Sequence, residues 1–148
     1  MLKTLIVGCE PTDMGDNSVW VDLYASEDVL IRPGSIAKVG LGVSIDEEAI
    51  KEMFMEDDSS DSCLLNKKKL NEFLSTHFLQ LNPRGSMRKS MVSTTGMINL
   101  NYRKEIKITF FNPASNDEYR IKQGARIAQL SLLQHSTSLL PSKTREKV

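Results

Sequence analysis

The chain has 148 residues, of which 40% are hydrophobic and 26% are charged, and 19 basic residues balance 19 acidic ones. This length and composition predict one soluble globular domain with a substantial core. The zero net charge argues against a protein that coats polymeric nucleic acid, because such proteins usually carry a basic excess. No apolar run approaches the length of a membrane span, and the apolar N-terminal stretch lacks a signal-peptide cleavage pattern. We therefore expect a cytoplasmic location and no membrane partner.

Neither the cysteines nor the histidines form a metal-binding pattern. Cys9 and Cys63 are far apart, so we expect free thiols in a reducing compartment. His77 and His135 have no spacing to them that would complete a metal motif, so structural or surface roles are expected. The sequence therefore predicts no metal site built from protein side chains.

Short β-strands with turn signals between them run through most of the chain. Their β-branched, aromatic or alternating residues lie at 2–7, 19–25, 29–31, 36–45, 78–81, 91–92, 106–111, 119–121 and 127–133. Arg32-Pro33-Gly34-Ser35 has the Pro and Gly positions of a type II turn. Gly40 and Gly42 lie inside one expected strand and indicate a bulge or a close backbone approach. Many short strands at close spacing predict an all-β sandwich or jelly roll.

Residues 46–76 interrupt this β pattern. Asp46–Met55 has a candidate N-cap, an acidic first turn and apolar residues near helical spacing. An acidic, hydroxyl-rich stretch at 56–62 predicts a solvated loop, and Leu64–Phe78 resumes helical spacing. We expect two short helices inserted into a single domain spanning 1–135, followed by an arm or disordered tail at 136–148.

The stretch 94–106 is the candidate ligand-binding segment. Gly96 allows a positive φ or a close approach to a ligand, because it lacks a Cβ. Period-2 alternation would place Asn99 and Asn101 on one face, and Tyr102 adds a flat ring with a polar tip. Two interpretations remain open from these residues alone: an ordinary hairpin with Asn in its turn, or the wall of a nucleotide pocket.

Four segments, in this order, resemble the conserved motifs of the dUTPase family. They are Val21-Asp22-Leu23-Tyr24-Ala25-Ser26, Pro83-Arg84-Gly85-Ser86, Gly96-Met97-Ile98-Asn99-Leu100-Asn101-Tyr102-Arg103 and Gly124-Ala125-Arg126-Ile127-Ala128-Gln129-Leu130. The family's first three patterns are Asp-Leu-x-Ala, Pro-Arg-Ser-Ser or Pro-Arg-Ser-Gly, and Gly-Val-Ile-Asp-x-Asp-Tyr-Arg. The fourth segment is very close to the family's fourth motif. The resemblance covers about 19–45 and 77–133. It implies a dUTPase-like jelly roll, with the helical segment as an insertion, in a homotrimer with sites at subunit interfaces.

The resemblance also implies a function and a set of site residues. The family cleaves dUTP to dUMP and pyrophosphate, using Mg²⁺ held by the triphosphate. By position, Tyr102 would pack on the deoxyribose, and Asp22 would lie near the metal-bound phosphates. The remaining nucleotide-binding positions would be Gly96, Met97, Ile98, Arg84, Gly85, Ser86, Arg126 and Gln129. Among viral and phage members, drift away from catalysis is known, in which case the location would be the host cytoplasm or nucleus.

Several departures from the family pattern argue against ordinary catalysis. Asn99 stands where the family has the acid that activates water, and a neutral amide cannot accept that proton. Asn101 replaces the second acid of that motif, and Gly85 replaces the serine after the motif-two Arg. Lys104 replaces a glycine, and no Gly-rich motif follows Gly124.

The sequence therefore predicts a dUTPase-like protein that binds or sequesters a deoxynucleotide with little or no hydrolysis. It could instead bind a protein partner through 46–76 or the tail. The alternative is an active dUTP diphosphatase in which Asp22 or another acid orients the water. A structural trimer without a ligand is less favoured. So is a dCTP deaminase, for which Glu105 would be the nearby acid.

Overall fold

A computed structural model gives the fold and describes residues 1–13, 19–55 and 60–135, with side chains from 64 onward in the last range. Three short helical segments are described: α1 (Glu47–Glu52), α2 (Ser60–Thr76) and the 3₁₀ turn η1 (Met87–Lys89). The strands are β1 (Leu2–Thr4), β2 (Thr12–Asp13), β3 (Trp20–Tyr24), β4 (Val29–Ile31), β5 (Ile36–Gly40), β6 (Val43–Ile45), β7 (His77–Pro83), β8 (Gly96–Asn99), β9 (Lys107–Phe111), β10 (Tyr119–Ile121) and β11 (Arg126–Gln134).

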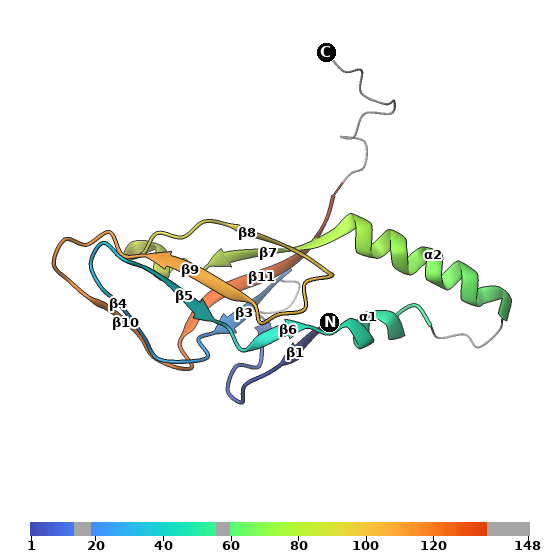
Figure 1. The fold of residues 1–148 in the computed structure, drawn as a ribbon, viewed down its shortest axis with the longest axis horizontal. Coiled ribbons are helices and arrows are strands. Elements are labelled where there is room, and N and C mark those ends of the chain that lie inside the picture. Colours follow the sequence, from blue (N-terminus) through green and yellow to red (C-terminus); the bar gives the residue numbers. More distant parts are fainter. Residues whose placement is uncertain (14–18, 56–59, 136–148) are drawn as a thin grey trace, which may run out of the picture.

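The strands form one five-stranded antiparallel sheet and three two-stranded ribbons (Figure 1). The large sheet has the order β2-β3-β11-β7-β8, so strands far apart in sequence lie side by side. The ribbons pair β1 with β6, β4 with β10 and β5 with β9. This architecture confirms the predicted all-β fold.

In the part of the chain that the structure describes, one hydrophobic core lies between the large sheet and the ribbons. The sheet contributes Leu23, Leu81 and Leu130, and the ribbon β5–β9 contributes Val39 and Phe110, all at most 3% exposed. The alternation of buried and exposed residues along β9 is the period-2 pattern of a half-buried strand. The core therefore fixes which faces of β7, β9 and β11 remain available for a site.

The expected strand 36–45 is wrong in its length, because the structure divides it at Gly42. That glycine has φ +66°, a left-handed conformation that other residues adopt at a cost. A Cβ added there would lie 2.6 Å from the Cβ of Cys9. The irregularity that glycine indicated inside this strand is therefore confirmed, and its physical reason is the close packing of Cys9.

Cys9 is a buried free thiol, as predicted for the first of the two cysteines. Its Sγ lies 3.7 Å from the carbonyl oxygen of Ala25, and only 1% of the residue is exposed. Burial raises the pKa of the thiol, and the nearby carboxylates of Glu10 and Glu105 raise it further. The side chain of Cys63 lies outside the described residues.

The helical insertion is confirmed, with different bounds. The Asp46 side chain caps α1 by accepting a hydrogen bond of 3.1 Å from the backbone N–H of Ala49. The helix is shorter than the predicted span, and its Ile50 is buried in the core. The second helix begins earlier than expected and passes directly into β7 at His77. In Figure 1, α2 extends away from the sheets, whereas α1 lies beside β6. Within the described residues, neither helix is long and apolar enough to cross a membrane.

Both histidines lie at the end of α2, where helix carbonyl groups lack partners. His77 Nδ1 lies 3.1 Å from the carbonyl oxygen of Phe73, and its ring stacks on the Phe73 ring at a centroid distance of 4.3 Å. His135 Nε2 lies 2.7 Å from the carbonyl oxygen of Ser75. These contacts support the predicted structural roles. The predicted tail at 136–148 lies outside the described residues, and so do residues 56–59 of the predicted acidic loop.

Candidate functional site

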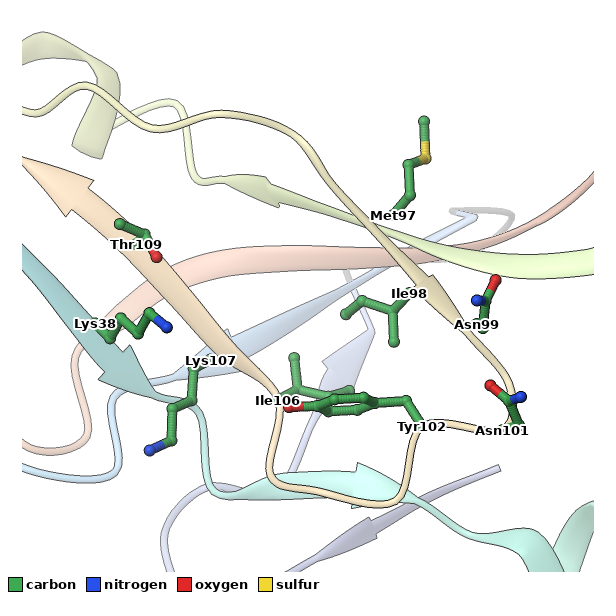
Figure 2. A pocket seen from close by; sticks show the side chains of 9 residues that line it. All are labelled: Lys38, Met97, Ile98, Asn99, Asn101, Tyr102, Ile106, Lys107 and Thr109. Atoms are coloured by element: carbon green, nitrogen blue, oxygen red, sulfur yellow. The ribbon is translucent and has the colours of Figure 1, made fainter.

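A hollow of about 390 Å³ opens beside the β8–β9 connection, a size typical of small-molecule sites (Figure 2). Its lining comes from the predicted binding segment and from the ribbon β5–β9. The lining residues are Lys38, Met97, Ile98, Asn99, Asn101, Tyr102, Ile106, Lys107 and Thr109. Of the predicted site residues, the hollow therefore brings together four: Met97, Ile98, Asn99 and Tyr102.

The hairpin before the hollow is held by β7. Gly96 pairs with Leu81 and Asn99 pairs with Phe78, so β8 forms one edge of the large sheet. Its successive side chains alternate: Figure 2 shows Ile98 on the side of Ile106 and Tyr102, and Met97 on the opposite side. An exposed edge strand leaves main-chain donors and acceptors unpaired, which a flat ligand with polar edges can use.

Two expectations for this hairpin are wrong. The strand ends at Asn99, and Asn101 lies in a turn that the 3.0 Å hydrogen bond from Tyr102 N–H to the Asn99 carbonyl closes. Period-2 alternation therefore does not extend to Asn101. Gly96 is not among the glycines with positive φ, and an added Cβ would make only ordinary contact with Leu81 at 3.5 Å. The expected positive φ is therefore wrong, whereas a close approach of a ligand to Gly96 stays a prediction.

Tyr102 forms an apolar wall of the hollow, with a polar tip. Figure 2 shows its ring lying beside Ile106, and 39% of the residue is exposed. Its hydroxyl donates a hydrogen bond of 3.4 Å to the carbonyl oxygen of Glu105. The ring is therefore tethered at its backbone and at its hydroxyl, and part of it stays exposed in the hollow.

The charge of the hollow is positive. Lys38 and Lys107 line it, whereas none of the lining residues is an acid. The register pairs Lys38 with Thr109 and Gly40 with Lys107, which places these lysines on the same face of the β5–β9 ribbon. Sequence reasoning missed both lysines and Thr109. The alternation along the two strands was the available signal, but the pairing of β5 with β9 was needed to use it.

A second group of predicted residues surrounds Asp22 in the middle of the large sheet. Arg84 Nη1 lies 2.6 Å from Asp22 Oδ1, and Arg126 Nη1 lies 3.4 Å from Asp22 Oδ2. Asp22 is 2% exposed, and its contacts with the two arginines account for the burial of an acid inside an apolar strand. Gln129 pairs with both Asp22 and Asn82 in the register, which places all three in one row across β3, β11 and β7.

Gly85 and Ser86 follow Arg84 at the end of β7. No atom lies within 4 Å of a Cβ added to Gly85, so a larger side chain fits there. Ser86 precedes η1 without a side-chain capping hydrogen bond. These two residues therefore lie next to the Asp22 group, which shares no residue with the lining of the hollow.

The hairpin is also linked to the helical insertion. Arg103 Nε donates a hydrogen bond of 3.0 Å to Glu47 Oε2 on α1. The Arg103 guanidinium beside Glu47 holds the pKa of that carboxyl below its ordinary value, with Lys51 contributing in the same direction. Sequence reasoning assigned no role to Glu47, because nothing local to 46–52 indicates a partner 56 residues later in the chain.

The described residues contain no group of three or more His, Cys, Asp or Glu side chains that could hold a metal ion. The acid nearest to such a role, Asp22, already has an arginine at each carboxylate oxygen. A cation bound together with a ligand would therefore rely mainly on oxygens of that ligand.

Fold and site together define a jelly-roll protein with a small-molecule hollow at a hairpin. A family model described as dUTPase matches residues 80–147. A deoxyuridine 5'-triphosphate nucleotidohydrolase of Corynebacterium jeikeium is 32% identical over 120 residues, which cover 81% of this chain. One of Nautilia profundicola is 29% identical over 73% of this chain. These matches support the assignment of the chain to the dUTPase family. It spans 60% of the length of each of these two relatives.

Solved structures of dUTPases have the same fold. A mutant of the Staphylococcus bacteriophage 80alpha dUTPase superposes with a TM-score of 0.68 at 18% identity, covering 100% of this chain and 96% of that one. An aspartate-to-asparagine mutant of the same phage protein with dUpNHpp gives 0.67 at 20% identity, over 100% and 96% of the two chains. The Streptococcus mutans dUTPase gives 0.64 at 17% identity, over 91% of this chain and 95% of that chain.

Proposed function

We propose that the chain binds a deoxyuridine nucleotide in the hollow at the β8–β9 connection and hydrolyses it slowly or not at all. The observation that carries this proposal is the lining of the hollow. It combines an open tyrosine ring, an edge strand with free main-chain groups and two lysines, but no acid. A ring, a sugar and phosphates each find a matching surface there.

The absence of an acid in that lining supports slow hydrolysis. Hydrolysis of a phosphoanhydride needs a group that accepts a proton from the attacking water, and the amide of Asn99 cannot do so. Asp22 is a poor substitute within this chain, because it is buried and both of its oxygens face arginine side chains. Loss of a general base typically lowers a rate by about 10²–10⁴-fold.

The arginines beside Asp22 suggest where phosphates would bind. The side chain of Arg126 is 53% exposed, and that of Arg84 is 23% exposed. In a homotrimer, the Asp22 group of one copy would complete the hollow of another, which accounts for two groups of site residues that share no member. Mg²⁺ would enter with the triphosphate and neutralise part of its charge. A phage phi11 dUTPase has a structural Mg(II) ion.

A second candidate function is active dUTP diphosphatase, converting dUTP to dUMP and pyrophosphate with Mg²⁺. The names of the two relatives, both deoxyuridine 5'-triphosphate nucleotidohydrolases, favour it. Under this alternative an acid from another copy, or Asp22 after movement of its arginines, would orient the water.

Calorimetry and pyrophosphate release together test the proposal. We expect the protein to bind dUMP and dUTP with Mg²⁺ more tightly than UTP or dCTP, with pyrophosphate release at least 10²-fold below ordinary dUTPase rates. Release at an ordinary rate would establish the alternative, and absence of binding to every nucleotide would overturn both.

Two variants of Tyr102 locate the site. Tyr102→Ala removes the ring and should weaken dUMP binding about fivefold or more, because stacking on an aromatic ring contributes roughly 1 kcal/mol. Tyr102→Phe keeps the ring and loses only a 3.4 Å hydrogen bond, so its Kd should stay close to that of the unmodified protein. Equal affinities for both variants would place the ligand elsewhere.

A further inference from the structure

One guanidinium joins the turn of the hairpin to the helical insertion. Besides its contact with Glu47, Arg103 Nη1 donates a hydrogen bond of 2.7 Å to the carbonyl oxygen of Leu100 and lies 3.4 Å from that of Tyr102. Arg103 therefore contacts two carbonyl groups of the turn through Nη1 and reaches α1 through Nε. A planar side chain with several fixed donors suits such a bridge.

The other end of this bridge is firmly attached to the body of the protein. Ile50 anchors α1 in the core at 2% exposure, and the backbone N–H of Asp46 donates a hydrogen bond of 2.7 Å to the Met1 carbonyl. Lys51 lies 3.4 Å from the second oxygen of Glu47, which restricts how the carboxylate can turn. Glu47 is therefore a fixed point against which the turn can be held.

The segment that the bridge holds carries the hollow's aromatic wall. Leu100 and Ile106 are buried at 1% and 0%, while the residues between them, apart from the half-buried Glu105, are exposed. Tyr102 lies in this exposed part, next to Arg103 in the chain. A contact that fixes the Arg103 side chain thus restricts the backbone from which the Tyr102 ring projects.

We propose that Glu47 is a positioning residue for ligand binding: it holds Arg103, and through it the turn that carries Tyr102. The helical insertion would then act as a support for the hairpin. This inference rests on the proposed function for its effect on affinity, but its effect on the hairpin itself is independent of any ligand.

The size of the effect follows from exposure. The side chains of Arg103 and Glu47 are 40% and 45% exposed. Ion pairs that are this exposed to solvent contribute little free energy. We therefore expect Glu47→Gln to raise the Kd for dUMP about two- to fivefold. Glu48→Gln is the matched control. It removes the same charge from the same helical turn, at a side chain that is 81% exposed and lies 4.0 Å from Lys51.

The experiment measures amide hydrogen exchange and dUMP affinity on the full chain. Glu47→Gln should speed hydrogen exchange at the Tyr102 amide, which donates a hydrogen bond to the Asn99 carbonyl. Exchange at the amides of β7 and β9 should stay unchanged. Glu48→Gln should change neither quantity. An Arg103→Met variant combined with Glu47→Gln should be no weaker than Arg103→Met alone, because both act through one contact.

Three results would overturn the inference: unchanged exchange in Glu47→Gln, the same change in Glu48→Gln, or additive losses in the double variant. A protein that binds no nucleotide, yet shows faster exchange only in Glu47→Gln, would refute the proposed function and leave the support of the hairpin established.

Discussion

Replacing Asn99 with aspartate tests the main chemical claim. Among the described residues none hydrogen-bonds the Asn99 side chain, which lies exposed at the end of β8. An aspartate at this exposed position would be ionised at neutral pH, because aspartate carboxyl groups ordinarily titrate well below neutrality. The substitution preserves shape at an exposed position, so stability should change by no more than about 0.5 kcal/mol.

A restored general base should raise pyrophosphate release about 10²–10⁴-fold, equivalent to about 2.7–5.4 kcal/mol of barrier. We expect Asn99→Asp to remain below ordinary dUTPase rates, because Gly85 still replaces a serine. Since a side chain fits at Gly85, adding Gly85→Ser tests that remaining difference.

The assay is steady-state pyrophosphate release from dUTP with Mg²⁺, with dUTP binding measured in parallel. Asn116→Asp is the control, because it makes the same substitution at an exposed residue that does not line the hollow. It should leave the rate unchanged. If Asn99→Asp binds dUTP but releases pyrophosphate no faster than the unmodified protein, the reasoning from the missing acid is refuted.

Four further predictions concern stability. Gly42→Ala should lower stability by about 2–4 kcal/mol and Tm by roughly 6–13 °C, because it adds left-handed strain to a 2.6 Å clash. Gly34 also has a left-handed φ (+71°), but no atom lies within 4 Å of an added Cβ. Gly34→Ala should therefore lower the free energy of unfolding by only about 1–2 kcal/mol, measured by thermal unfolding. Asp22→Ala should cost about 1–3 kcal/mol in denaturant titration, because Arg84 loses its buried partner. Because the contact with Arg103 lowers the pKa of Glu47, the ionised carboxylate stabilises the folded state at neutral pH. This stabilisation is lost as the pH falls below a carboxyl's usual range and Glu47 is protonated. Acid titration should therefore show a smaller loss in Glu47→Gln.

The β-fold was predictable because its strands and turns carry local signals. The turn at Gly34 and the strands at 29–31 and 119–121 follow directly from proline, glycine and β-branched residues. The division at Gly42 was predictable as an irregularity but not as a break. Its cause is Cys9, which lies 33 positions earlier in the chain.

The candidate site was predictable only in part, for a similar reason. Tyr102 and Asn99 belong to one continuous motif, and the structure places both in one hollow. The burial of Asp22 depends on arginines 62 and 104 residues away, and the bridge to Glu47 crosses 56 residues. Periodicity reports which face of a strand is buried, but it cannot report which charged partner arrives from another element.

The packing of Cys9 against Gly42 makes this thiol a reporter of local opening. A thiol at 1% exposure with a raised pKa reacts with an alkylating reagent only when the segment before β2 moves away from β6. In a Cys63→Ser background, the rate of labelling would therefore measure how often the N-terminal ribbon β1–β6 opens. β6 leads directly into α1. The labelling rate of Cys9, measured with and without nucleotide, would therefore show whether a nucleotide in the hollow makes the ribbon β1–β6 open less often.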